Sequence, residues 1–185
     1  MNAHARDKAC FGASWNLATV AELEVICATE SCETVRDEVL GRHTSMGVGG
    51  STPLMVWPSH PEAVAKVLEW CADRGLAWRT LGGGSNILVS DAGVIEPVIN
   101  LTNLVDGANI QATTAKLPAG MPIAQALRTT IRSGLAGLVW STGLPGTIGG
   151  AVAGNAGCWG GQMADVVASI DLIDANGKWQ TLENK

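Results

Sequence analysis

The most informative stretch of this chain for its fold is residues 81–88, which read Leu81-Gly-Gly-Gly-Ser-Asn-Ile-Leu88. Three consecutive glycines remove every Cβ from this turn, so its backbone N–H groups can converge on an anion such as a phosphate. Ser85 and Asn86 add polar side chains beside them. The alternative is a tight loop between strands that binds nothing, because glycine serves turns as readily as ligands.

The residues before this turn predict a β-α-β unit. An apolar run at 54–57 indicates one strand, and residues 77–81 indicate another. Between them, apolar residues at helical spacing from Val64 to Cys71 predict a helix that ends at Gly75. Ser59 and Glu62 have the spacing of a capping box for that helix, and residues 87–89 predict a further strand. The glycine turn therefore follows the second strand of the unit.

A second glycine-rich segment reads Gly143-Leu-Pro-Gly-Thr-Ile-Gly-Gly-Ala-Val152, and glycines continue to Gly161. Backbone of this kind can lie close to a flat or charged ligand, and the Thr147 hydroxyl can donate a hydrogen bond. The alternative is a close approach of buried elements. Trp140 and Trp159 lie near this segment, where they either stack on a flat ring or pack in a core.

The flanks of the second segment predict a helix and a hairpin. Residues 123–131 carry apolar side chains at helical spacing up to a stop at Gly134. Residues 169–173 and 178–182 flank the turn Asp174-Ala-Asn-Gly177, which is a strong hairpin signal. We therefore predict an α+β protein with mixed sheets and two glycine loops.

Composition and motifs exclude several classes of function. A net charge of −5 without a Lys/Arg cluster argues against a nucleic-acid partner. The long uncharged run at 133–164 contains Pro145 and many glycines, so we expect no membrane span. Five cysteines without a C-x-x-C pair favour reduced thiols in a cytoplasm, and we expect no metal site.

The dinucleotide fingerprint, the P-loop and the G-x-S-x-G elbow are all missing from the sequence. His43 fits a polar loop residue better than a catalytic base.

Residues 1–40 show little pattern, although residues 21–39 are compatible with a helix. We interpret 1–40 as a divergent N-terminal leader and 41–185 as the domain. Within the domain we expect one lobe at about 41–105 and a second, incomplete lobe at about 106–185.

Three segments resemble the UDP-N-acetylenolpyruvoylglucosamine reductase family in their residues, in their order along the chain and in their spacing. They are Arg42-His-Thr-Ser-Met-Gly-Val-Gly-Gly50, the stretch 81–89, and the stretch 143–152 together with Asn155-Ala-Gly-Cys-Trp-Gly160. The similarity covers residues 41–185. It implies an α+β, two-lobed FAD-binding fold of the vanillyl-alcohol-oxidase (PCMH) type, with FAD between the lobes.

The resemblance also implies the site residues. Those expected to hold the FAD pyrophosphate are Gly82, Gly83, Gly84, Ser85 and Asn86. Those expected to line the flavin and its ribityl chain are Gly143, Pro145, Gly146, Thr147, Gly149, Gly150 and Ala151. Asn155 and Trp159 are expected to contact a UDP-sugar substrate. Trp159 stands where the family commonly has a tyrosine.

The implied reaction is reduction of UDP-N-acetylglucosamine enolpyruvate in peptidoglycan precursor synthesis, with NADPH as hydride donor. The family's Tyr-Arg pair, proton-donating serine and glutamate are expected beyond Lys185, and the chain contains no tyrosine. We therefore assign no catalytic residue and expect this chain alone to be inactive. A non-catalytic flavin-binding module and another oxidase of the same fold remain as alternatives.

Overall fold

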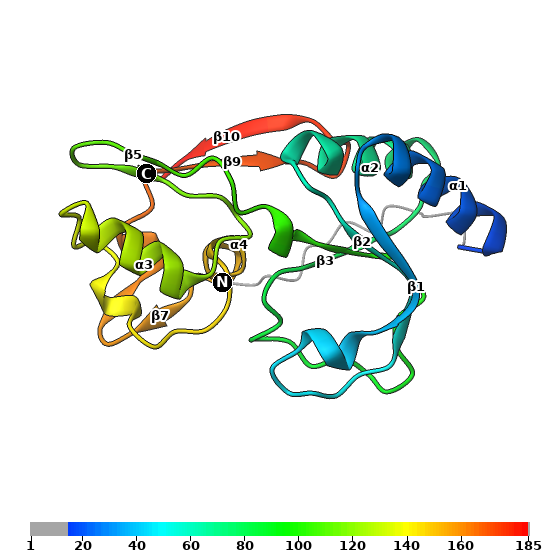
Figure 1. Ribbon diagram of the computed structural model, residues 1–185, viewed down its shortest axis with the longest axis horizontal. Coiled ribbons are helices and arrows are strands. Elements are labelled where there is room, and N and C mark those ends of the chain that lie inside the picture. The colour runs from blue at the N-terminus through cyan, green and yellow to red at the C-terminus, as the bar shows by residue number, and fades with distance from the viewer. Residues whose placement is uncertain (1–14, 185) are drawn as a thin grey trace.

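The computed structural model describes residues 15–184, which form two lobes with separate apolar cores (Figure 1). The core of the first lobe draws on residues between Val20 and Leu104. The core of the second lobe draws on residues between Met121 and Met163. The glycine-rich turns lie where the two lobes meet, so the separation of the cores positions the site.

The first lobe is built on a four-stranded sheet in the order β1-β2-β4-β3. β1 pairs antiparallel with β2, whereas β2 and β3 both pair parallel with β4. The elements of this lobe are α1 (Leu17–Thr29), β1 (Glu33–Val39), η1 (Leu40–His43), β2 (Ser51–Trp57), α2 (Pro61–Asp73), β3 (Arg79–Leu81), β4 (Val98–Asn100) and η2 (Leu101–Asn103).

The second lobe consists of short elements joined by turns, and a longer hairpin follows it. Its elements are β5 (Asn109–Ile110), β6 (Ala115–Lys116), α3 (Ile123–Arg132), η3 (Val139–Ser141), α4 (Ile148–Ala153), β7 (Gly157–Cys158), β8 (Gly161–Gln162) and η4 (Met163–Asp165), and the hairpin strands are β9 (Ser169–Ile173) and β10 (Trp179–Glu183).

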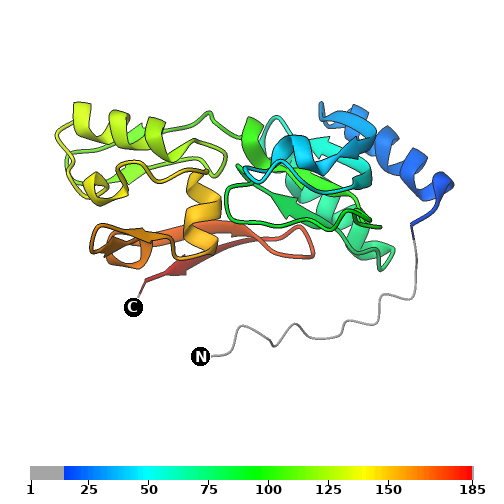
Figure 2. The same ribbon diagram turned by 90° about the horizontal axis from the view of Figure 1, so that it is seen from below.

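The β9–β10 hairpin connects the two lobes (Figures 1 and 2). The Nζ of Lys178, next to its turn, lies 3.7 Å from the Glu69 carboxylate on α2. Ile173 packs against the core of the first lobe, and Lys116 on β6 contacts Asp171 on β9 at 2.6 Å. The hairpin therefore fixes the second lobe beside the first.

Several predicted elements are confirmed, because their sequence signals were strong. α2 and α3 occupy the two helical patterns, and β9 and β10 flank the predicted turn. β2 contains the predicted strand at 54–57. The capping box was wrong: the helix begins after His60, whose Nδ1 accepts from the Ala63 N–H at 3.1 Å.

One further predicted element was wrong. Residues 87–89 are not a strand, and Leu88 is 73% exposed. The central strand is instead β4, a short, wholly buried run directly after Pro97, which is the character of a strand inside a parallel sheet.

The leader interpretation was also wrong for the residues that the structure describes. α1 buries Val20, Leu23 and Cys27 in the first core, and β1 pairs with β2 along six residue pairs. Residues 15–40 therefore belong to the first lobe. The rest of the predicted leader, residues 1–14, lies outside the described residues.

Arg79 on β3 makes a two-point ion pair with Glu96, which lies just before β4. The guanidinium donates at 3.0 and 3.1 Å to the two carboxylate oxygens. Burial alone raises the pKa of Glu96, but the Arg79 guanidinium and nearby backbone N–H groups more than offset this, so the pKa lies below its usual 4.5. The pair therefore stabilises the edge of the sheet above that pH.

The Glu96→Gln variant should show a weaker acid dependence of stability. A carboxyl with a lowered pKa in the folded state stabilises the fold above its unfolded pKa, and this is lost as pH falls through the folded value. Between about pH 5 and pH 3 the wild type should lose up to about 1 kcal/mol more unfolding free energy than the variant. Urea unfolding at both pH values measures this, and parallel losses would contradict it.

Candidate functional site: a cleft between two glycine turns

The two glycine-rich turns lie in direct contact with each other. Ser85 Oγ donates to the Pro145 carbonyl oxygen at 3.4 Å. A Cβ placed on Gly83 would stand 3.0 Å from the Cα of Gly146, and one on Gly82 would stand 2.6 Å from Oγ1 of Thr147. The approach of the turns therefore depends on missing side chains, as the sequence indicated.

The first turn presents a row of unused backbone donors. Within residues 15–184, the N–H groups of residues 82–86 donate no hydrogen bond, and neither do those of Gly146 and Thr147. Successive backbone N–H groups without protein acceptors can form a concave nest that binds phosphate oxygens. This part of the chain therefore fits the pyrophosphate of a dinucleotide.

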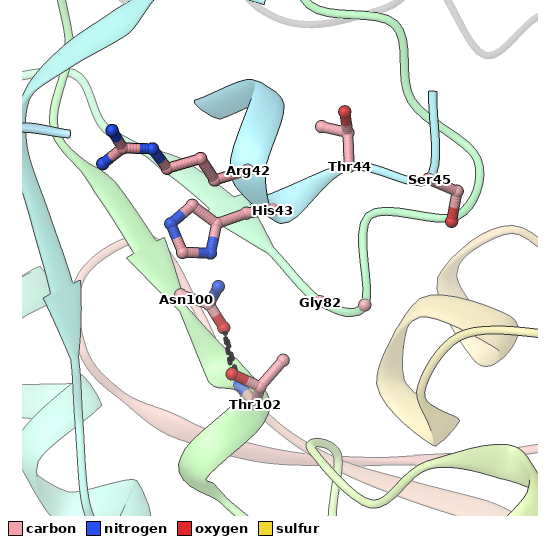
Figure 3. Close-up of a pocket in the computed structure, with 8 residues that line it drawn as sticks. Arg42, His43, Thr44, Ser45, Gly82, Asn100 and Thr102 are labelled. Atoms are coloured by element: carbon pink, nitrogen blue, oxygen red, sulfur yellow. Dashed lines mark hydrogen bonds between the residues drawn. The ribbon is translucent and has the colours of Figure 1, made fainter. Parts of the chain in front are cut away.

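A polar pocket of about 300 Å³ opens beside the first turn (Figure 3). This volume is at the lower end of the range for ligand pockets. The residues that line it are Arg42, His43, Thr44, Ser45, Gly82, Gly83, Asn100 and Thr102.

Asn100 ends the buried strand β4 at the floor of this pocket. Its Oδ1 accepts from the N–H of Thr102 at 2.9 Å and from its hydroxyl at 2.6 Å. Its Nδ2 makes no hydrogen bond within the described residues and points toward His43 (Figure 3). The side chain is therefore held in place with a free amide donor at the pocket.

The segment 42–45 forms the opposite wall and is tied to the glycine turn. The N–H of Ser45 donates to the Gly84 carbonyl oxygen at 3.0 Å. His43 Nε2 lies 2.9 Å from Oε1 of Glu38, and the guanidinium of Arg42 lies 3.7 Å from the same atom. Arg42 is largely exposed, and its guanidinium lies beside the Glu38 carboxylate, on the side of the pocket away from Gly82 (Figure 3). This wall is therefore polar and is held to the glycine turn by a backbone hydrogen bond.

Sequence reasoning missed part of this wall. The segment 42–50 was quoted for its resemblance but received no role, and Asn100 and Thr102 were not singled out. One signal was present: an Asn with a Thr two residues later, at the end of an apolar run, is typical of a side chain that caps a turn.

The predicted residues of the second turn occupy two kinds of position. Gly146, Thr147 and Gly150 face the first turn, whereas Gly143 lies apart from it with open space around it. Gly149 donates its N–H to the Ala119 carbonyl oxygen at 2.8 Å, and Ala151 is buried in the second core. Asn86 is exposed at the end of the first turn. A contact of each with FAD stays a prediction.

Of the predicted substrate residues, Trp159 lies in the turn between β7 and β8, and Asn155 lies just before β7. Asn155 uses its side chain within the protein, where Oδ1 accepts from the Ala164 N–H at 2.9 Å and Nδ2 donates to Gln162 at 3.0 Å. Trp159 is 81% exposed, and its Nε1 donates to the Thr142 carbonyl oxygen at 3.1 Å. Its ring is therefore available at the surface beside the glycine turn.

Trp140, the other tryptophan near this segment, packs inside the second lobe. Its ring fills the space that a Cβ on Gly161 would need. Its buried Nε1 has no hydrogen-bond partner among the described residues. The core-packing alternative therefore holds for Trp140, in contrast to Trp159.

None of the helices within residues 15–184 is long and apolar enough to cross a bilayer. In the same residues, no group of three or more His, Cys, Asp or Glu side chains is arranged to hold a metal ion.

Comparison with known proteins identifies relatives of this arrangement. The UDP-N-acetylenolpyruvoylglucosamine reductase of Heliobacterium modesticaldum is 33% identical over 144 residues, which are 78% of this chain and 46% of that protein. The crystal structure of the Thermus caldophilus enzyme superposes with a TM-score of 0.66 at 30% identity, covering 83% of this chain and 52% of that one. The chain spans about half the length of the curated relatives it matches. The resemblance to these reductases is confirmed.

The fold extends to more distant proteins. The structure of 6-hydroxy-D-nicotine oxidase from Arthrobacter nicotinovorans superposes with a TM-score of 0.63 at 18% identity, covering 82% of this chain and 35% of that one, which is a likeness of fold alone. The prediction of an α+β, two-lobed flavoprotein fold is confirmed. Residues 52–183 match the family described as FAD binding domain. The chain therefore belongs to the FAD binding domain family.

Proposed function

We propose that this chain is the FAD-binding portion of a reductase that converts UDP-N-acetylglucosamine enolpyruvate to UDP-N-acetylmuramate, with NADPH as hydride donor. The proposal rests on the contact between the two glycine turns. Beside this contact, the consecutive backbone N–H groups of residues 82–86 have no acceptor within the described residues. The similarity to reductases at about one-third identity supports the choice of reaction. A cytoplasmic location, in peptidoglycan precursor synthesis, belongs to the same proposal.

In this proposal the chain binds and orients the cofactor. The N–H groups of residues 82–86 hold the pyrophosphate, Asn100 and Arg42 provide further polar contacts, and the turn at 143–150 lies along the flavin side. When bound, FAD supplies the hydride-transfer chemistry. We assign no catalytic residue within this chain. The sequence has no tyrosine for the Tyr-Arg pair of the resembled family, and that family's proton-donating serine and glutamate have no motif-matched counterpart here.

The domain limits form a further part of the proposal. The two cores separate between Leu104 and Met121, so we propose lobes on either side of about residue 105. The first lobe begins before residue 41, since α1 and β1 belong to its core and its sheet.

Spectral titration tests the function. FAD bound to the purified chain should show flavin bands that shift when UDP-N-acetylglucosamine enolpyruvate is added, and that stay unchanged with amine or sugar substrates of oxidases that share the fold. Shifts with the oxidase substrates alone would favour the oxidase alternative. No response to any substrate would favour the non-catalytic module. NADPH consumption that depends on the UDP-sugar should be absent, and turnover would contradict our view that catalytic residues are missing.

Replacing Trp159 should weaken binding of the UDP-sugar without affecting the fold. The exposed ring is placed to stack on the ligand, and a stacking contact is worth about 1 kcal/mol. Trp159→Ala should therefore raise the dissociation constant for the UDP-sugar by about fivefold to tenfold, as measured by calorimetry on the FAD-loaded chain. Trp179→Ala, an exposed tryptophan on β10, is the matched control and should have no effect. Equal behaviour of the two variants would remove Trp159 from the site.

A further inference from the structure

The C-terminal end of α1 brings two cysteines together. The N–H of Cys32 donates to the Cys27 carbonyl oxygen at 2.8 Å, and the N–H of Ser31 donates to the Ala28 carbonyl oxygen at 3.4 Å. Ser31 has a φ of 56°. These two crossed hydrogen bonds and the left-handed residue between them form a Schellman motif. The motif usually joins its first and last side chains in an apolar contact, and here those side chains are Cys27 and Cys32.

The two thiols have different surroundings. Cys27 is fully buried in the first core, whereas Cys32 is only partly buried and packs against that core from its edge. Cys32 Sγ also lies 3.8 Å from the Glu30 carbonyl oxygen, a long and weak contact. The pair therefore has one thiol at the edge of the core and one inside it.

The pKa values of the two thiols differ in a way that matches their difference in burial. The neighbouring Cys32 side chain raises the pKa of Cys27, and burial adds to this. The Cys27 side chain in turn lowers the pKa of Cys32. Cys71, the third cysteine of this core, is fully buried, and burial raises its pKa to about 12. Since the thiolate is the reactive form, Cys32 has the character of a nucleophile and Cys71 that of an inert thiol.

We propose that Cys27 and Cys32 form a peroxide-sensitive dithiol, in which Cys32 is the attacking thiol and Cys27 the resolving thiol. Nearby cysteines with one exposed, nucleophilic member are the pattern of thiols that oxidise reversibly. The alternative is a cysteine pair that serves only as the small apolar contact of the helix end. α1 lies at the end of the first lobe away from the second lobe (Figure 1). The proposal is thus independent of the proposed function.

The reaction consumes one hydroperoxide and releases water. The Cys32 thiolate attacks an oxygen of hydrogen peroxide, so that an S–O bond forms, the O–O bond breaks, and the departing hydroxide takes a proton to become water. The Cys27 sulfur, losing its proton, then attacks the Cys32 sulfur. An S–S bond forms, the S–O bond breaks, and the oxygen leaves as a second water. The two cysteines lose two electrons together, and a dithiol reductant restores them.

Peptide mapping after a brief treatment of the folded chain with hydrogen peroxide tests the proposal. No Lys or Arg lies between Lys8 and Arg36, so trypsin leaves both cysteines on one peptide, and cleavage after Glu30 then separates them. We expect the fragments that carry Cys27 and Cys32 to stay joined until a reductant is added. This linkage should exceed any linkage to Cys71 by about tenfold or more.

Single variants test the order of attack. In Cys27→Ala, dimedone should label Cys32 as a trapped sulfenic acid, whereas in Cys32→Ala it should leave Cys27 unlabelled. Cys71→Ala is the matched control and should form the Cys27–Cys32 linkage as the wild type does. Circular dichroism confirms that each variant is folded before treatment. Linkage to Cys71, linkage only in urea, or no linkage at all would overturn the proposal and leave the pair as an apolar contact.

Discussion

The Gly83→Val variant should lose its affinity for FAD while remaining folded. Gly83 lies at the closest approach of the two turns, where an added Cβ meets the Cα of Gly146 at 3.0 Å and the N–H nitrogen of Thr147 at 3.5 Å. A branched side chain must push the turns apart or project into the space of the pyrophosphate. We expect the dissociation constant for FAD to rise at least about 100-fold, which is about 3 kcal/mol of binding free energy.

Two further variants make this result interpretable. Gly137→Val is the matched control, because a Cβ there would meet only Val166 at 3.8 Å, and its FAD affinity should equal that of the wild type. Gly83→Ala needs a displacement of only a few tenths of an ångström and should weaken FAD about tenfold. Flavin fluorescence titration measures all three, and circular dichroism reports the fold. Retained affinity in folded Gly83→Val would remove the first turn from the cofactor site.

The Gly84→Ala variant should be markedly less stable than the wild type. Gly84 has a φ of 64°, a conformation that costs other residues about 1–2 kcal/mol. A Cβ at this position would also overlap the His43 carbonyl oxygen, in a segment that the Ser45–Gly84 hydrogen bond holds against the turn. With the cost of overpacking added, we expect a loss of about 3 kcal/mol in the free energy of unfolding.

Gly75→Ala separates the two contributions. Gly75 has nearly the same φ, 61°, but a Cβ there would meet nothing within 4 Å. Its replacement should therefore cost only the backbone contribution, about 1–2 kcal/mol. Urea unfolding curves give both values as shifts in midpoint at constant slope. Equal losses in the two variants would show that the approach of segment 42–45 to the glycine turn does not constrain position 84.

The parts of the fold that could be predicted are those with a complete local signal. The spacing of Val64, Val67, Leu68 and Cys71 predicted α2, and these residues are all buried. The sequence Asp174–Gly177 predicted the hairpin turn. In the structure, the Asp174 side chain accepts hydrogen bonds from the backbone N–H groups of Asn176 and Lys178. In both cases the sequence contains the contacts that form the element.

The parts that were missed depend on contacts distant in sequence. β4 is a strand only because β2 and β3 lie on either side of it, and its three residues show no alternation. The apolar residues at 87–89 have no strand to pair with. α1 has apolar residues on all sides, so its buried face is set by the core it meets and not by its own pattern.

The candidate site also has a part that the sequence predicted and a part that depends on contacts distant in sequence. Glycines without Cβ atoms indicated that residues 82–84 and 143–150 bind or approach something, and the structure brings Gly83 to Gly146. The sequence could not show that the turns touch each other, since that follows from packing of the two lobes. Nor could it show that Asn100 reaches the same pocket from the end of β4.

Hydrogen–deuterium exchange of the chain with and without FAD tests the shared cofactor site most directly. The N–H groups of residues 82–86, which donate to no described acceptor, should exchange quickly without FAD and slowly with it. We predict that FAD slows exchange at residues 82–86 and at residues 143–151 over the same range of FAD concentration. Protection of only one turn, or of neither, would contradict the account.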